Sequence, residues 1–155
     1  MTQTTLDEQA SERIECKFCL ITKHSLEATI VFEDASTVVF LDRRPLFPGH
    51  CLVVPREHYQ TLADLPTDLV GALFESVRIV SRAVESGMKA QGTFVAINNK
   101  VSQSVPHIHV HVVPRRAKDG LRGFFWPRRK YSSQEEELRA RDAIRNEIEK
   151  LKGGN

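Results

Sequence analysis

Hydrophobic and polar positions alternate in several short stretches of the chain, and in one long stretch the hydrophobic positions recur at helical spacing. From Asp64 to about Met88 apolar residues return every three or four positions, which predicts an amphipathic helix. The alternating stretches predict short strands, two within residues 28–42, where the turn-forming EDAS segment separates them, and three over residues 50–55, 93–99 and 107–113.

Short strands at hairpin spacing together with one long helix indicate an α+β fold with an antiparallel sheet of about five strands. The tail predicts a second helix, because Ser133 and Glu136 form a capping box and basic residues close the chain. Its apolar positions are sparse, so we expect a peripheral helix, part of a subunit contact, or a solvated tail. The expected organisation is a disordered N-terminus over residues 1–13, a folded domain over 14–116 and a C-terminal extension over 117–155.

Composition limits the partners of the chain. With 155 residues and 41% hydrophobic positions the chain can bury one proper core, and its net charge of +2 is too small for a nucleic-acid coat. Residues 115–130 are strongly basic, and the aromatic residues at 124–126 lie among them. This stretch predicts either a surface that attracts anionic ligands or bases, or a solvated loop with packing aromatics.

The cellular setting follows from what the sequence does not contain. No apolar stretch approaches the roughly 18 residues of a membrane span, and the first 13 residues have no apolar core of a secretory signal. Three cysteines cannot form a disulfide framework. We therefore expect a cytoplasmic protein with no membrane partner and no stable nucleic-acid partner.

The segment PHIHVHVVP, residues 106–114, carries the candidate chemistry. In a strand the aliphatic residues face the core while His107, His109 and His111 share the other face, with same-face neighbours roughly 6.6 Å apart. Two functions suit such a row: a polyhistidine metal site, or imidazoles acting as nucleophile and acid or base. An imidazole is a good phosphorus nucleophile because its pKa near 6.5 leaves a neutral lone pair, and Gln103 and Ser104 nearby could assist the leaving oxygen.

These motifs resemble those of one known family. SQSVPHIHVHVVPR resembles the histidine triad (HIT) motif, in which histidines alternate with hydrophobic residues, and FLDRRPLFPGHCLVVPREH resembles the segment that precedes it. The resemblance implies a HIT-like fold and a homodimer that shares a continuous sheet. It also implies a nucleotide hydrolase or transferase that cleaves at the α-phosphorus of a small nucleotide, expected to be a purine nucleotide. One departure is the compact NNKVSQS stretch, which lacks a glycine before the glutamine and puts the leaving-group pocket in doubt.

The resemblance also implies roles for individual residues. His109 would be the nucleophile that takes the nucleotidyl group, His111 would contact the α-phosphate, and Asp42 would bind the ribose hydroxyls. Phe18 and Leu41 would line the base pocket. The phosphate and leaving group would be held by Asn98, Asn99, Gln103 and Ser104. No catalytic metal would be required.

The CKFC segment brings in a metal. Cys16 and Cys19 form half of a structural zinc site, whereas a thioredoxin-like redox role would need a βαβ context that is absent. In a subset of HIT proteins the same cysteine pair is joined by two histidines, which here are His58 and His107. Such a set leaves no open position on zinc and so marks a structural ion. His50, outside this set, is expected to order a loop.

Three functions remain open from the sequence. The first is a HIT hydrolase acting on dinucleoside polyphosphates or nucleoside phosphoramidates through a covalent nucleotidyl-histidine intermediate. The second is a nucleotide-binding or sensing module with little turnover. The third is a hydrolase whose metal is catalytic and held by His107, His109 and His111.

Overall fold

The computed structural model describes residues 15–121 and 129–153. The described residues up to Asp119 belong to one compact unit, and those from Gly120 belong to a second. The predicted disorder of residues 1–13 lies outside the described residues, as do the aromatic residues 124–126 of the basic segment.

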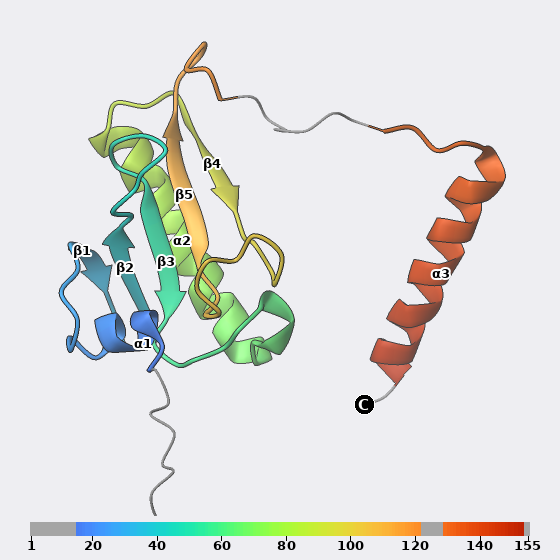
Figure 1. The fold of residues 1–155 in the computed structure, drawn as a ribbon, viewed down its shortest axis with the longest axis horizontal. Helices are drawn as coiled ribbons and strands as arrows, with labels where there is room; N and C mark the ends of the chain where they lie inside the picture. The colour runs from blue at the N-terminus through green and yellow to red at the C-terminus, as the bar shows by residue number, and fades with distance from the viewer. Residues whose placement is uncertain (1–14, 122–128, 154–155) are drawn as a thin grey trace, which may run out of the picture. The chain divides into compact units, whose positions relative to one another are not determined.

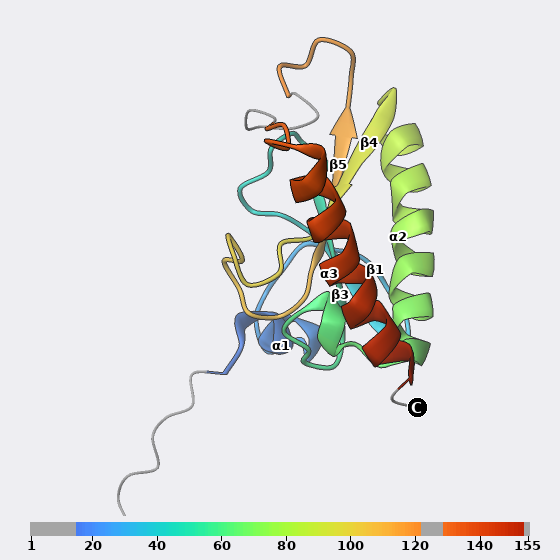
Figure 2. The same ribbon diagram turned by 90° about the vertical axis from the view of Figure 1, so that its right-hand side faces the viewer.

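The first unit contains one sheet of five antiparallel strands in the order β1-β2-β3-β5-β4 (Figure 1). Two helices lie on opposite faces of this sheet, the long α2 (Thr67–Gly87) and the short α1 (Lys17–Thr22), as Figure 2 shows. The predicted α+β class and antiparallel sheet are therefore confirmed. The strands are β1 (Ile30–Glu33), β2 (Thr37–Leu41), β3 (Cys51–Pro55), β4 (Gly92–Ala96) and β5 (Val110–Arg115).

The alternation along each strand separates two hydrophobic clusters. On the α2 face, the buried strand residues Val53 and Val110 pack with Leu73 and Val77 of α2, as the four-and-three spacing of that helix predicts. The α1 face is covered by a smaller cluster made of Phe18, Ile21, Val38, Phe40, Leu52 and Val54. Because a strand turns successive side chains to opposite faces, His111 of β5 is on the α1 face, opposite the buried Val110 and Val112.

The strand that carries the histidines begins later than predicted. β5 starts at Val110, not at His107, because the Ile108 N–H donates to the Tyr59 carbonyl at 2.7 Å and the His107 N–H donates to the Val105 carbonyl at 2.8 Å. Neither bond belongs to a ladder with a neighbouring strand. The segment before Val110 is thus held by loops, and its aliphatic residue Ile108 still lies in the core.

Other boundaries also differ from the prediction. β4 ends at Ala96, so Asn98 and Asn99 belong to the following loop. The long helix begins at Thr67 with Pro66 as its N-cap, after a short 3₁₀ helix at Leu62–Asp64. α1 and the 3₁₀ helix were not predicted, because elements of three to six residues are too short to display a periodic stripe.

The second unit contains α3 (Gln134–Gly153). The Glu136 N–H donates to the Ser133 Oγ at 3.1 Å, as the capping-box pattern predicts, and none of the helix residues is buried. Of the helices that the structure describes, none is long and apolar enough to cross a membrane.

Candidate functional site

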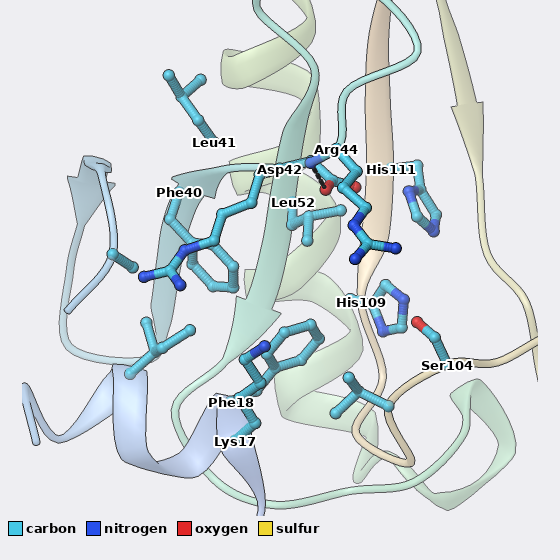
Figure 3. Close-up of a pocket in the computed structure, with 14 residues that line it drawn as sticks. Lys17, Phe18, Phe40, Leu41, Asp42, Arg44, Leu52, Ser104, His109 and His111 are labelled. Carbon is cyan, nitrogen blue, oxygen red and sulfur yellow. Dashed lines mark hydrogen bonds between the residues drawn. The ribbon is translucent and has the colours of Figure 1, made fainter. Parts of the chain in front are cut away.

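A pocket of about 660 Å³ opens on the α1 face of the sheet, over β2, β3 and β5 (Figure 3). Six of the nine residues predicted to bind a nucleotide line it, namely Phe18, Leu41, Asp42, Ser104, His109 and His111. The Leu41 side chain, however, packs on the cluster of the α2 face, so Phe40 takes its predicted place beside Phe18. Asn98, Asn99 and Gln103 do not line it. The fold therefore brings together most of the residues that the sequence singles out, although they come from four separate segments.

One wall of the pocket is aromatic. The Phe18 ring, on α1, packs edge-to-face on Phe40 of β2 with ring centroids 5.4 Å apart, and on His109 with centroids 5.1 Å apart. Leu52 of β3 completes this wall. An apolar aromatic wall beside a polar edge suits a planar heterocycle.

His109 has its Nδ1 engaged, while its Nε2 has no hydrogen-bond partner among residues 15–121 and 129–153. Its Nδ1 lies 2.8 Å from the His107 carbonyl oxygen, and since a carbonyl only accepts, Nδ1 must carry the proton. Nε2 of the neutral ring then holds the lone pair. The ring is buried, with only 4% of its surface exposed, and it lines the pocket. This geometry fixes the ring by its Nδ1 and leaves Nε2 as the nitrogen available to whatever binds there.

His111 shows the opposite tautomer because His50 lies beside it. The Leu46 N–H donates to the Nδ1 of His50 at 3.1 Å, so the His50 proton is on Nε2, which donates to the Nδ1 of His111 at 2.9 Å. The Nε2 of His111 therefore carries a proton and can donate it. Burial, followed by the charges of His109 and His50, lowers the pKa of His111 to about 4, so this donor is neutral at pH 7.

The role of His50 in the site goes beyond what the sequence indicates. The expected loop-ordering role is confirmed by the bond from Leu46, whereas the contact with His111 was not foreseen. This contact depends on the pairing of β3 with β5, in which Leu52 lies opposite His111. The PGH segment and the histidine row carry no local signal of that pairing.

Asp42 lies at the pocket edge and belongs to a chain of polar groups. Its Oδ1 accepts the Arg44 N–H at 2.8 Å, and its Oδ2 lies 3.8 Å from the Nε2 of His50. Asp42, His50 and His111 have ligand atoms close enough to hold a metal ion. Both ring nitrogens of His50 are already engaged, however, so the three groups are better described as a hydrogen-bonded His50–His111 pair beside a carboxylate than as a metal site.

The loop before the histidines uses two predicted site residues for its own structure. Asn99 Oδ1 accepts the Leu62 N–H at 2.9 Å. Gln103 Oε1 accepts the Lys100 N–H at 2.8 Å, and its Nε2 donates to the Gln60 carbonyl at 2.6 Å. These side chains fix the loop that presents Ser104 to the pocket, and in this structure neither points its polar atoms into the pocket.

Next to the pocket, four side chains from three segments converge as a candidate metal centre. The ligand atoms of Cys16, Cys19, His58 and His107 all lie within 4.8 Å of one another. The His107 Nδ1 is 3.6 Å from the Cys16 Sγ and 3.5 Å from the Cys19 Sγ, while the His58 Nδ1 is 3.3 Å from the Cys19 Sγ. Tetrahedral zinc with ordinary bond lengths requires sulfur-to-nitrogen separations of about 3.6 Å. The four residues therefore fit zinc.

Protonation supports the same fit. The His107 Nε2 donates to the Pro55 carbonyl at 2.9 Å, which leaves the lone pair on Nδ1, facing the thiols. Burial lowers the pKa of His107 to about 4, so the ring is in its metal-binding neutral form. Burial and the neighbouring Cys16 raise the pKa of Cys19 to about 11, so binding of a cation would release thiol protons.

The metal group, made of Cys16, Cys19, His58 and His107, is connected to the pocket through His107 and through α1. The His107 side chain belongs to the metal group, while its carbonyl holds the His109 ring. Phe18, which packs on His109, lies on α1 between Cys16 and Cys19. Both the nucleophile candidate and its aromatic wall are thus connected directly to the metal group.

The comparison with known proteins decides the family. A family model described as the HIT domain matches residues 23–118, which is more than half of the chain. The chain belongs to the HIT family. This agrees with the histidine row that leads into β5 and with the pocket that His109 and His111 line.

Several HIT relatives resemble this chain over most of its length. An uncharacterised HIT-like protein of Saccharolobus solfataricus is 36% identical over 77% of this chain and 88% of its own length. An adenylylsulfatase of Arabidopsis thaliana is 30% identical, covering 74% of this chain and 59% of its own. A bis(5'-nucleosyl)-tetraphosphatase of Schizosaccharomyces pombe is 32% identical over 63% of this chain and 54% of its own.

Solved HIT structures share the fold. A member of the family from Bacillus subtilis matches with a TM-score of 0.77 and 28% identity, over 85% of this chain and 96% of that one. A zinc-bound histidine triad protein from Mycobacterium smegmatis matches with a TM-score of 0.66 and 34% identity, over 88% of this chain and 97% of that one. A metal-bound relative and a converging Cys/His group in this chain agree with each other.

Proposed function

We propose that this HIT protein is a nucleotide hydrolase that cleaves at the α-phosphorus of small nucleotides through a nucleotidyl adduct on His109. The observation that carries the proposal is the His109 ring, whose Nδ1–H is fixed on the His107 carbonyl so that the Nε2 lone pair is presented in the pocket. The tetraphosphatase and adenylylsulfatase names of two relatives support the same class of substrate.

Two steps complete the reaction. In the first, the Nε2 lone pair of His109 forms a bond to the α-phosphorus, and the bond to the leaving group breaks. The leaving group departs with that electron pair and takes up a proton that the Ser104 hydroxyl relays from solvent, matching the proton released in the second step. In the second, water attacks the phosphorus, the P–N bond breaks, and its electron pair returns to Nε2 while a nucleoside monophosphate and a proton are released. The adduct ring is cationic, and the His107 carbonyl next to Nδ1 stabilises that charge.

The neighbours of His109 bind the substrate. The Nε2–H of His111 would donate to a non-bridging oxygen of the α-phosphate, where negative charge increases during attack. The base would lie on the wall made by Phe18 and Phe40, with a purine filling the aromatic surface best, and the Asp42 carboxylate would accept from the ribose hydroxyls. No step requires a catalytic metal.

Zinc is the ion that the Cys/His group fits, and we propose that Cys16, Cys19, His58 and His107 hold it. When bound, zinc supplies a structural cross-link and no chemistry, because the four protein ligands leave no open position. The triad residues do not share a metal site in the described part of the chain, since His107 faces the cysteines while His109 faces the pocket. This placement argues against a catalytic ion held by the three histidines.

We also propose a homodimer with a continuous sheet. β4 is at one edge of the sheet, and its Val95 side chain is exposed. An edge strand presents free N–H and C=O groups that a second copy can pair. Light scattering on the purified full-length chain would test the expected mass of two copies, and a mass of one copy at micromolar concentration would contradict this assignment.

The test of the enzymatic proposal is a single-turnover experiment with adenosine 5'-phosphoramidate. Rapid quench followed by intact-protein mass spectrometry should detect an adenylyl group on the wild type and none on His109→Ala, which should still bind AMP. Near-wild-type hydrolysis by His109→Ala would refute the mechanism. Normal AMP binding by the wild type, with kcat/KM far below about 10⁴ M⁻¹s⁻¹ on every nucleotide, would favour a sensing module instead.

A further inference from the structure

Positive charge at the pocket exceeds what one α-phosphate requires. Lys17, Arg43 and Arg44 line the pocket, together with a single carboxylate, Asp42. The two arginines are adjacent in sequence but differ in what they contact. The Arg43 Nη2 donates to the Glu27 carbonyl at 2.7 Å, so that guanidinium is partly committed to the protein.

The Arg44 guanidinium makes no hydrogen bond or ion pair with any residue between 15 and 121 or between 129 and 153 that the structure describes. Its backbone, by contrast, is held, because the Arg44 N–H donates to the Oδ1 of Asp42 two residues earlier. Such a bond from an aspartate to the second following residue fixes a turn. The turn directs the Arg44 side chain toward the space in front of His109 and His111, as Figure 3 shows.

The position of this charge suggests what it binds. The base and ribose side of the pocket is formed by Phe18, Phe40 and Asp42, and the reacting nitrogen is on His109. A cation beside the two histidines is therefore near the α-phosphate and the group attached to it, rather than near the base. A planar guanidinium with unsatisfied donors matches the oxygens of phosphate or sulfate.

We propose that Arg44 determines leaving-group specificity by binding an anionic leaving group, so that substrates carrying a phosphate chain or sulfate beyond the α-phosphate are preferred over those carrying a neutral amine. This inference rests on the proposed hydrolase function and narrows its substrate class. The exposed position of Arg44 means that solvent and salt screen the interaction. We therefore expect an effect of about tenfold in kcat/KM, which is about 1.4 kcal/mol.

Three adenylyl substrates separate the possible sources of negative charge. Diadenosine tetraphosphate presents a polyphosphate, adenosine 5'-phosphosulfate presents a sulfate, and adenosine 5'-phosphoramidate presents an amine. Arg44→Ala should lower kcat/KM about tenfold for at least one of the first two and less than twofold for the phosphoramidate. Arg44→Lys keeps the charge but not the planar pair of donors, so it should recover part of the loss.

The matched control is Arg78→Ala, which also removes one positive charge. Arg78 is on α2, on the opposite face of the sheet, where it pairs with Glu75. It should change all three rates equally and by less than twofold. Moderate salt should reduce the preference of the wild type for anionic leaving groups and leave the Arg44→Ala ratios nearly unchanged.

An equal loss on all three substrates, or no loss on any, would overturn the inference. Binding separates this result from a failure of the proposed function. Calorimetry on His109→Ala and on the His109→Ala/Arg44→Ala double variant would compare diadenosine tetraphosphate with AMP. The wild type could fail to hydrolyse any substrate while the Arg44 substitution still selectively weakens tetraphosphate binding. In that case the hydrolase proposal would fail and the Arg44 assignment would stand. The Arg44 assignment would be rejected if the ratio of the affinities for diadenosine tetraphosphate and AMP were the same in both variants, or if neither ligand bound.

Discussion

Replacing His50 by alanine is expected to impair catalysis through His111, which His50 contacts, rather than through direct contact with the substrate. His50 accepts the Leu46 N–H and donates to the Nδ1 of His111 at 2.9 Å. Without that donor, Nδ1 of His111 can carry the proton itself, and the Nε2–H proposed to donate to the α-phosphate is then lost. Removing one donor that stabilises a transition state lowers kcat by about 10²–10³ in other enzymes. Because His111 retains a fraction of the productive tautomer, we expect about 10- to 100-fold.

The cost to stability should be moderate. Two hydrogen bonds contribute about 1 kcal/mol each, and the cavity left by a buried side chain adds to this, so His50→Ala should lower the free energy of unfolding by about 2–4 kcal/mol. His50→Gln provides the informative comparison, because the Gln side-chain amide can reach the position of Nε2 and still donate to His111. This variant should retain most of kcat even though it loses the acceptor for Leu46. His24→Ala, which removes an exposed histidine paired with Glu33, is the control.

Two measurements decide the matter. Long-range ¹H–¹⁵N spectra of the imidazoles should show His111 protonated at Nε2 in the wild type and in His50→Gln, and a mixture of tautomers in His50→Ala. In His50→Ala the acidic limb of the kcat–pH profile should move to higher pH. The reason is that burial and the charge of His50 both lower the pKa of His111 in the wild type. If His50→Ala keeps kcat within twofold, or if the tautomer of His111 is unchanged, the relay from His50 to His111 does not operate.

Three further outcomes are expected. Chelation, or the Cys19→Ser substitution, should release zinc and lower Tm by about 10 °C, because a structural ion contributes several kcal/mol to stability. AMP binding should also weaken, because α1 carries part of the pocket. A metal-depleted protein with unchanged Tm would contradict the structural role. Burial lowers the pKa of His111 to about 4 from an unfolded value near 6.5, so the unfolded chain takes up its proton first as the pH falls. Stability should be full above pH 6.5 and decline toward pH 4, and urea unfolding of His111→Asn should show a shallower decline than the wild type. Gly49→Ala should lower the free energy of unfolding by about 1–3 kcal/mol in chemical denaturation, because Gly49 has a φ of +94° and a Cβ there would lie 2.6 Å from Met88 Cγ. Gly87, where a Cβ would meet no atom within 4 Å, should tolerate alanine without loss.

The regular part of the fold could be predicted because its signal is periodic. The α2 stripe and the alternation around His109 each repeat over enough residues to identify an element and its buried face. The same alternation correctly placed the aliphatic residues of β5 in the core, while the start of that strand was wrong because Ile108 bonds to a loop carbonyl that lies far away in the sequence.

The arrangement of the site residues could be predicted less completely from local sequence patterns. The cysteine pair indicates half of a metal centre, and only a family resemblance could supply His58 and His107, which distant loops bring to it. The contact of His50 with His111 requires the register of β3 on β5. The bonds of Gln103 to neighbouring backbone require the path of two loops. Each of these is a tertiary relation that no local pattern specifies.

The carbonyl of His107 has a practical consequence for redesign. Mutagenesis exchanges side chains and leaves the main-chain oxygen in place, so the hydrogen bond that holds the reactive ring persists with any residue at this position, provided that the backbone keeps its path. In the function proposed above, the metal group supports that path and takes no part in the reaction. A tightly packed set of apolar residues at its four ligand positions would then give a protein that works without any ion.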